Sequence, residues 1–157
     1  MRVGIGFDAH PFAEGRPLKL GGVAIPHPRG LAGHSDGDAL LHAIADALLG
    51  AAGRGTLGEH FPDGSAAWRG ADSAVLLGRA AGLVGEAGFR VGNVDAIVIA
   101  ETPKIAPHAS AVRSRLAEIL GIDTGRVSVR GTSANGLGFT GRGDGIAVVA
   151  VVLLEEP

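Results

Sequence analysis

The sequence predicts an α/β protein: a two-layer sandwich with helices packed on one face of a mixed β-sheet. Two observations predict this class. Segments with strand periodicity alternate along the chain with longer, helical segments. The helical segments are apolar on one side, as amphipathic helices are. The 157 residues contain neither an internal repeat nor a linker, so residues 1–157 are expected to form one domain.

The composition excludes several classes of protein. Apolar residues make up 46% of the chain but aromatic residues only 4%, so the core must consist mainly of Ala, Val, Leu and Ile. The formal net charge of −2 argues against a nucleic-acid partner. Because cysteine is absent, any metal must bind His and carboxylate groups. The chain starts with a strand-like segment and has no apolar run of membrane-spanning length, so we expect a cytoplasmic protein with no membrane partner.

The first half of the chain is organised around one helix, predicted at residues 33–50. Ser35 or Asp36 is a suitable N-cap for this helix, and Gly50 is a suitable end. The other predicted segments are a strand at 2–7, a turn at 11–17, a hairpin at 18–25, a turn at 26–30 with an exposed His27, and a glycine-rich loop at 53–70. Long loops in compact domains are commonly functional, so we interpret the last segment as a flap with Trp68 as its packing anchor.

The second half of the chain continues the alternation. The predicted segments are helices at 72–87 and 109–120, strands at 91–100, 127–131 and 145–154, and a loop at 101–107 that contains two prolines. The last two strands follow one another without an intervening helix, and an early hairpin precedes them. Both features indicate a mixed sheet rather than a parallel one.

A candidate metal site combines the first strand with the central helix. Asp8 and His10 lie two residues apart in an extended segment, so their side chains point to the same side. Asp38, His42 and Asp46 recur every four residues and form one polar stripe on the helix. With His42, the strand pair would provide three N and O ligands and leave a fourth position open, as in a catalytic zinc site. Asp38 or Asp46 is then expected to hold the second ring nitrogen of His42. The alternative is a surface histidine flanked by two carboxylates.

A second candidate site is the glycine-rich segment at residues 132–144. Closely spaced glycines allow backbone N–H groups to approach an anion, and Arg142 supplies a fork-shaped donor. This pattern suits phosphate binding. A glycine-rich hairpin would contain the same residues, so the pattern alone leaves both interpretations open.

Six motifs occur together in register: DAH at 8–10, HSDGDALLHAIADALLGA from 34, FPD at 61–63, ADS at 71–73, PK at 103–104 and LGFTGRGDGIA from 137. Together they resemble the 2-C-methyl-D-erythritol 2,4-cyclodiphosphate synthase family over essentially the whole chain. The resemblance implies a phosphorus–oxygen lyase of non-mevalonate isoprenoid biosynthesis. In its reaction, the 2-phosphate of 4-diphosphocytidyl-2-C-methyl-D-erythritol 2-phosphate attacks the phosphate next to the methylerythritol, and CMP leaves. The resemblance also implies a homotrimer with active sites at the subunit interfaces.

The resemblance implies two metal ions and a set of catalytic groups. It makes Asp8, His10 and His42 the ligands of a catalytic Zn²⁺, and it places Mg²⁺ or Mn²⁺ on the substrate diphosphate. His34 and Ser133 correspond to the catalytic groups. A metal at this position acts as a Lewis acid and a template for in-line phosphoryl transfer. Because the nucleophile is a phosphate of the substrate itself, no strong general base is expected.

The resemblance also implies a substrate-binding set that includes the three metal ligands and His34. Its other members, which contact the phosphates, the methylerythritol or the cytosine, are Ser35, Thr56, Gly58, Phe61, Asp63, Ser65, Ala100, Pro103, Lys104, Ala106, Thr132, Ser133, Asn135, Phe139 and Arg142. Residues 61–65 correspond to a substrate loop, and residues 100–106 correspond to the cytosine pocket.

Four positions depart from the family pattern. Asn135 stands where an acidic residue usually helps to bind the second metal, and Thr56 replaces an Asp that contacts the methylerythritol hydroxyls. Ser133 replaces the common Thr, and Val149 replaces a Glu often found in the central trimer cavity. Two alternatives remain: Asp8, His10 and His42 would equally suit a zinc phosphodiesterase that uses water, and the lost acidic residues would suit a catalytically impaired homologue that binds cytidine nucleotides.

Overall fold

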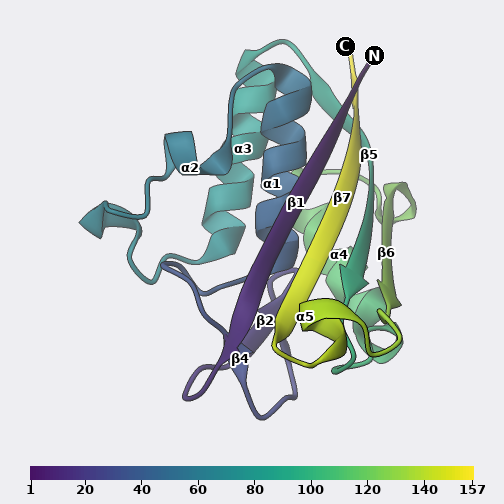
Figure 1. Cartoon of the computed structure of the whole chain (residues 1–157). Coiled ribbons are helices and arrows are strands. Elements are labelled where there is room, and N and C mark those ends of the chain that lie inside the picture. The colour runs from purple at the N-terminus through teal and green to yellow at the C-terminus, as the bar shows by residue number, and fades with distance from the viewer.

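The chain alternates strands and helices, as the sequence predicts. In this computed structural model, which describes residues 1–157, the strands are β1 (Arg2–Ala13), β2 (Leu18–Leu20), β3 (Val23–Ile25), β4 (Gly30–Leu31), β5 (Arg90–Ile99), β6 (Val127–Thr132) and β7 (Gly145–Glu155). The helices are α1 (Ala39–Ala52), α2 (Leu57–His60), α3 (Ser73–Glu86), α4 (Ala109–Leu120) and α5 (Gly138–Gly141). The long helices α1, α3 and α4 cover one face of the sheet, and the two termini lie side by side (Figure 1). No helix combines the length and the hydropathy that crossing a membrane requires.

The main sheet has five strands in the order β4-β1-β7-β5-β6, and β2 and β3 form a separate hairpin. β7 runs antiparallel to both β1 and β5, whereas β5 and β6 are parallel, so the predicted mixed sheet is confirmed. β6 and β7, which follow one another along the chain, are not neighbours in the sheet, because β5 lies between them. β7 is apolar along almost its whole length, which favours a central position between two neighbours over an edge.

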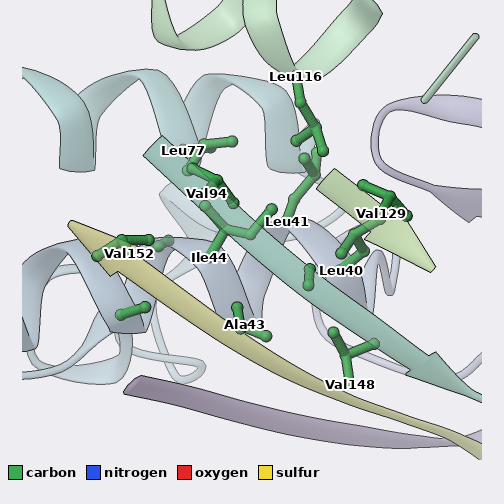
Figure 2. Close-up of a cluster of buried hydrophobic side chains, with 14 of the residues drawn as sticks. Leu40, Leu41, Ala43, Ile44, Leu77, Val94, Leu116, Val129, Val148 and Val152 are labelled. Carbon is green, nitrogen blue, oxygen red and sulfur yellow. The ribbon is translucent and has the colours of Figure 1, made fainter. Parts of the chain in front are cut away.

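The core lies between α1 and the sheet. Every residue of α1 is buried except His42, Asp46 and Gly50. Figure 2 shows how side chains from all three long helices meet those of the strands: Leu40, Leu41 and Ile44 of α1, Leu77 of α3 and Leu116 of α4 pack over Val94, Val129, Val148 and Val152. The two polar positions of α1 are therefore exceptions in a buried helix.

Two glycines allow α1 to lie directly against β1. A Cβ atom at Gly4 would lie 2.0 Å from the carbonyl oxygen of Ala47, and one at Gly6 would lie 1.9 Å from the carbonyl oxygen of Ala43. Side chains in a strand alternate between its faces, so Asp8 and His10 continue the same helix-facing row. The close packing therefore brings the side chains of β1 and α1 together at the end of this row.

The central helix begins later and ends later than predicted. Its N-cap is Asp38, whose side chain accepts a hydrogen bond from the Leu41 backbone N–H, rather than Ser35 or Asp36. Its C-cap is Gly53 in the left-handed conformation at φ 67°, rather than Gly50. Asp38 also accepts hydrogen bonds from two backbone N–H groups of the β2–β3 turn, and these long-range contacts determine which polar residue caps the helix.

The predicted flap contains short helices. α2 has a capping box formed by Thr56 and Glu59, and a 3-10 turn covers Ala66–Trp68. Trp68 packs edge-on against Phe61 with the ring centroids 5.0 Å apart, which agrees with its predicted role as a packing anchor.

The prediction of an exposed His27 is wrong. Its ring is half-buried and stacks on the ring of Phe12, with centroids 4.8 Å apart. Its Nδ1 lies 2.8 Å from the carbonyl oxygen and 3.2 Å from the backbone nitrogen of Arg29, and its Nε2 lies 3.2 Å from Thr102 Oγ1. The sequence around His27 predicted exposure because the residues that cover its ring, Phe12 and Thr102, are distant along the chain.

Candidate active site

Asp8, His10 and His42 converge on one point between β1 and α1. His10 Nε2 lies 2.7 Å from Asp8 Oδ2, and His42 Nδ1 lies 3.2 Å from the same oxygen. The two ring nitrogens are 3.4 Å apart, and the three ligand atoms lie within 4.8 Å of one another. All three side chains are half-buried. Asp8 and His10 of β1 and His42 of α1 therefore form a group that could hold a metal ion, as the sequence predicts.

A backbone carbonyl orients His10. Its Nδ1 lies 2.6 Å from the carbonyl oxygen of Ala32, which can only accept a hydrogen bond. Nδ1 must therefore carry a proton, and in the neutral ring the lone pair is on Nε2, which faces Asp8 and His42. This outer contact fixes the tautomer that a metal ligand needs.

The electrostatics of the group favour a bound cation. Burial opposes the ionisation of Asp8, but hydrogen bonds from His10 and His42 outweigh it and lower the pKa of Asp8 to about 2. The hydrogen bond to Asp8 raises the pKa of His10, against the opposing effect of burial. A proton shared between Asp8 and His10 occupies the position at which a divalent cation would interact with both side chains.

The outer nitrogen of His42 does not contact Asp38 or Asp46, so that prediction is wrong. His42 Nε2 lies 2.9 Å from Ser73 Oγ and 3.1 Å from Ser35 Oγ. Ser73 is not among the site residues predicted from the sequence, although it lies within the ADS motif at 71–73.

The two carboxylates of the helical stripe have structural partners instead. Asp38 is fully buried, and burial raises its pKa despite three hydrogen bonds from the backbone of Gly22, Leu41 and Gly21. Asp46 accepts a hydrogen bond of 2.6 Å from the Leu57 backbone N–H, which ties α1 to the start of α2. The polar stripe on this buried helix therefore divides into His42, which belongs to the candidate metal group, and two carboxylates that accept hydrogen bonds from backbone N–H groups.

A pocket of about 250 Å³ opens beside the three converging side chains. Eight of its lining residues are among those predicted from the sequence: Asp8, His10, His34, Ser35, His42, Gly58, Phe61 and Asp63. Gly33, Asp46, Leu57, Trp68 and Leu76 complete the lining. Residues of the predicted flap form one wall, which agrees with its interpretation as a segment over the site.

A second pocket of about 230 Å³ lies where β5 and β6 end. It is lined by Ala100, Pro103, Lys104, Ile105, Ala106, Gly131, Thr132 and Ser133. Six of these are predicted site residues, all except Ile105 and Gly131. Because β5 and β6 are parallel, their carboxyl ends meet at the same edge of the sheet and bring the loops after them together.

Five predicted site residues line neither pocket. Thr56 caps α2 and is exposed, and the carbonyl of Ser65 lies 3.2 Å from His34 Nε2. Asn135 has a left-handed backbone at φ 53° and accepts a hydrogen bond of 3.3 Å from Ser133 Oγ. The other two, Phe139 and Arg142, are exposed at α5, and Arg142 pairs with Asp144.

The fold and the site define a class of two-layer α/β proteins. In this class an Asp/His/His group lies between a strand and the central helix, here β1 and α1. A separate pocket is formed by loops at the carboxyl ends of two parallel strands, here β5 and β6. The model of the YgbB family matches residues 1–155, and the chain belongs to this family. The family prediction is confirmed.

Curated relatives match the chain over nearly its full length. The 2-C-methyl-D-erythritol 2,4-cyclodiphosphate synthase of Bacillus cereus (strain B4264) is 54% identical over 155 residues, which cover 99% of this chain and 98% of that protein. The protein of the same name from Alcanivorax borkumensis is 56% identical over 156 residues and covers 99% and 98%.

Solved structures show the same fold. A 2C-methyl-D-erythritol-2,4-cyclodiphosphate synthase in a CDP-bound form is 38% identical with a TM-score of 0.90, covering 98% of this chain and 100% of that one. The bifunctional IspDF of Campylobacter jejuni is 44% identical with a TM-score of 0.96, covering 99% of this chain but 42% of that longer one. The predicted α/β fold with helices on one face of a mixed sheet is confirmed.

Proposed function

We propose that the protein is a 2-C-methyl-D-erythritol 2,4-cyclodiphosphate synthase, a phosphorus–oxygen lyase of non-mevalonate isoprenoid biosynthesis. It converts 4-diphosphocytidyl-2-C-methyl-D-erythritol 2-phosphate to the cyclic diphosphate and CMP, acting as a single domain of residues 1–157. The observation that carries the proposal is the convergence of Asp8, His10 and His42 in a chain that matches synthases of this name over nearly its full length.

The donor set fits a zinc ion. Two imidazole nitrogens and one carboxylate oxygen are ligands that zinc accepts, and three protein ligands leave a position for substrate. When bound, zinc supplies Lewis-acid stabilisation and a template for the phosphates. Asp8, His10 and His42 would hold it against β1 and α1, and Mg²⁺ or Mn²⁺ would accompany the substrate diphosphate.

The lining of the first pocket suits the reacting phosphate and the methylerythritol. His34 and Ser35 lie in this lining next to the metal group, where they can hold the 2-phosphate and orient it for in-line attack. Ser35 is 7% exposed, so its hydroxyl is held in a fixed position. Because a phosphate dianion is already a nucleophile, the residues must position and neutralise charge, and no strong base is required.

The second pocket suits the cytidine end of the substrate. A relative of the same fold is named as a CDP-bound form, and the Plasmodium falciparum IspF, 35% identical with a TM-score of 0.86 over 99% of this chain and 96% of that one, as a CDP complex. In this chain, the backbone of the loop at 100–106 would recognise the edge of the cytosine base. Lys104 belongs to this loop, Thr132 and Ser133 would contact the phosphates, and Ser133 and His34 are the two proposed catalytic groups.

We further propose that three copies assemble so that the first pocket of one subunit and the second pocket of its neighbour form one active site. Val3, Ile5 and Phe7 on the outer face of β1 are 69%, 73% and 59% exposed, and the neighbouring Val151 of β7 is 41% exposed. The face of the sheet opposite the helices carries this apolar row, and contiguous exposed apolar surface is typical of an interface between subunits. Phe139 and Arg142 would add contacts there. Light scattering of the purified protein tests the trimer.

Phosphorus NMR of the zinc-loaded protein with the cytidine-linked substrate and magnesium tests the reaction. We expect a cyclic diphosphate and CMP in equal amounts. A linear phosphate product would instead identify a zinc phosphodiesterase. Unchanged substrate that stays bound would identify a catalytically impaired homologue that binds cytidine nucleotides.

A further inference from the structure

A chain of hydrogen bonds runs from the candidate metal group to the start of α3. His42 Nε2 lies 2.9 Å from Ser73 Oγ, and the Ser73 hydroxyl donates a short hydrogen bond to Asp36 Oδ1. The backbone N–H of Ser73 donates to the other oxygen of Asp36 at 3.2 Å. Ser73 is 0% exposed, so water does not compete for these contacts. In Figure 1, α3 lies beside α1, and the contact with His42 comes from Ser73, the first residue of α3.

The proton inventory of this chain determines which nitrogen of His42 carries hydrogen. A carboxylate only accepts, so the single hydroxyl proton of Ser73 is committed to Asp36. The Ser73 oxygen then has only lone pairs to offer toward His42, and a lone pair on Nε2 at 2.9 Å would be repelled. Nε2 must therefore carry a proton, and a metal ion that displaces the Nδ1 proton shared with Asp8 finds the Nδ1 lone pair already facing Asp8 and His10.

We propose that Asp36 and Ser73 are positioning residues that hold His42 in the Nε2–H tautomer and so increase the affinity of the site for a divalent metal ion. This inference rests on the proposed metal-dependent function. It gives His42 an arrangement parallel to that of His10, whose Nδ1–H is fixed by the carbonyl of Ala32. Outer contacts of this kind keep a ligand from rotating or changing tautomer, and their loss typically weakens metal binding about 10–100-fold.

Several contacts hold Asp36 in position. Its Oδ1 accepts a hydrogen bond from the Asp38 backbone N–H at 3.2 Å, and its own N–H donates to the Ala71 carbonyl at 3.1 Å. Lys19 Nζ lies 3.7 Å from its Oδ2. The carboxylate thus joins the N-terminal ends of α1 and α3, and the orientation of His42 depends on how these two helices pack.

Zinc titration of the metal-free protein in competition with a chromophoric chelator tests the proposal. We expect Ser73→Ala to weaken zinc binding about tenfold, because Ser35 Oγ at 3.1 Å can partly replace the lost acceptor. The double variant Ser35→Ala/Ser73→Ala should weaken it about 100-fold. Asp36→Asn keeps the shape of the side chain and provides the test if the serine variants fold poorly. Asp72→Asn is the matched control: it removes a carboxylate from the N-cap of the same helix but lacks contact with His42, so zinc affinity should change less than about twofold.

The tautomer provides a readout that a merely structural role would leave unchanged. Nitrogen-15 NMR of the metal-free protein should show His42 protonated at Nε2, and Ser73→Ala should shift the proton toward Nδ1. Zinc affinity within twofold of the wild type in Ser73→Ala and Asp36→Asn would overturn the proposal, as would weaker binding with an unchanged tautomer. Neither experiment uses substrate. A failure of turnover with the expected metal data therefore contradicts only the proposed reaction, and an active enzyme with unchanged zinc affinities contradicts only this inference.

Discussion

Replacing Gly6 with Ala would place a methyl group inside the contact between β1 and α1. The new Cβ would lie 1.9 Å from the carbonyl oxygen of Ala43, whereas ordinary contact begins at 3.4 Å, so the strand and the helix must separate by about 1.5 Å. The oxygen belongs to the backbone of a buried helix, which cannot rotate away as a flexible side chain can. Overpacking of this kind costs about 1–3 kcal/mol and occasionally more, and we expect about 3 kcal/mol here.

The same separation should weaken metal binding, because Ala43 is adjacent to His42. A ligand displaced by more than about 0.5 Å relative to Asp8 and His10 loses the geometry of the site, so we expect zinc affinity to fall at least about tenfold. Urea unfolding at fixed protein concentration with a chelator present measures the stability of the metal-free protein, and competition with a chromophoric chelator measures the affinity.

Gly78→Ala is the matched control for this experiment. Gly78 lies within α3, and nothing lies within 4 Å of a Cβ added there, so the substitution should stabilise the protein by about 0.5–1 kcal/mol. A free energy of unfolding of Gly6→Ala within about 1 kcal/mol of the wild type, together with equal zinc affinity, would show that the close approach of β1 and α1 does not build the site.

Four further predictions concern the metal sites and their ligands. His42→Ala should abolish zinc binding and activity while the circular dichroism spectrum is retained, whereas His108→Ala should bind zinc normally; unchanged zinc content would remove His42 from the ligand set. Asn135→Asp should lower the magnesium concentration for half-maximal rate, and no shift in a magnesium titration would mean that the charge comes from elsewhere or is not needed. The lowered pKa of Asp8 should stabilise the metal-free protein by about 2 kcal/mol above pH 3.8, and this stability should be lost as the pH falls through about 2; Asp8→Asn should remove that pH dependence of urea unfolding. The raised pKa of His10 should make zinc affinity rise with pH above 6.5, and an affinity independent of pH from 6 to 9 would contradict it.

Local patterns in the sequence determined much of the fold. The boundaries predicted for the third long helix, at 109–120, agree with α4, and the predicted strands lie within one residue of β5, β6 and β7. Periodicity works here because each element buries one side or both, and the burial pattern is written directly into the residue order. The predicted caps of the central helix were less accurate. Several polar residues precede α1, and only contacts with the distant β2–β3 turn determine that Asp38 is its N-cap.

The sequence by itself also determined the residues of the metal group, because alternation in β1 and the four-residue spacing in α1 place Asp8, His10 and His42 on definable faces. Only the tertiary structure decided what lies behind His42. Ser73 is far away along the chain, and the stripe residues Asp38 and Asp46, which spacing favoured, bind backbone groups instead. Spacing states which side chains share a face, whereas the partner of a ring nitrogen depends on which helices pack together.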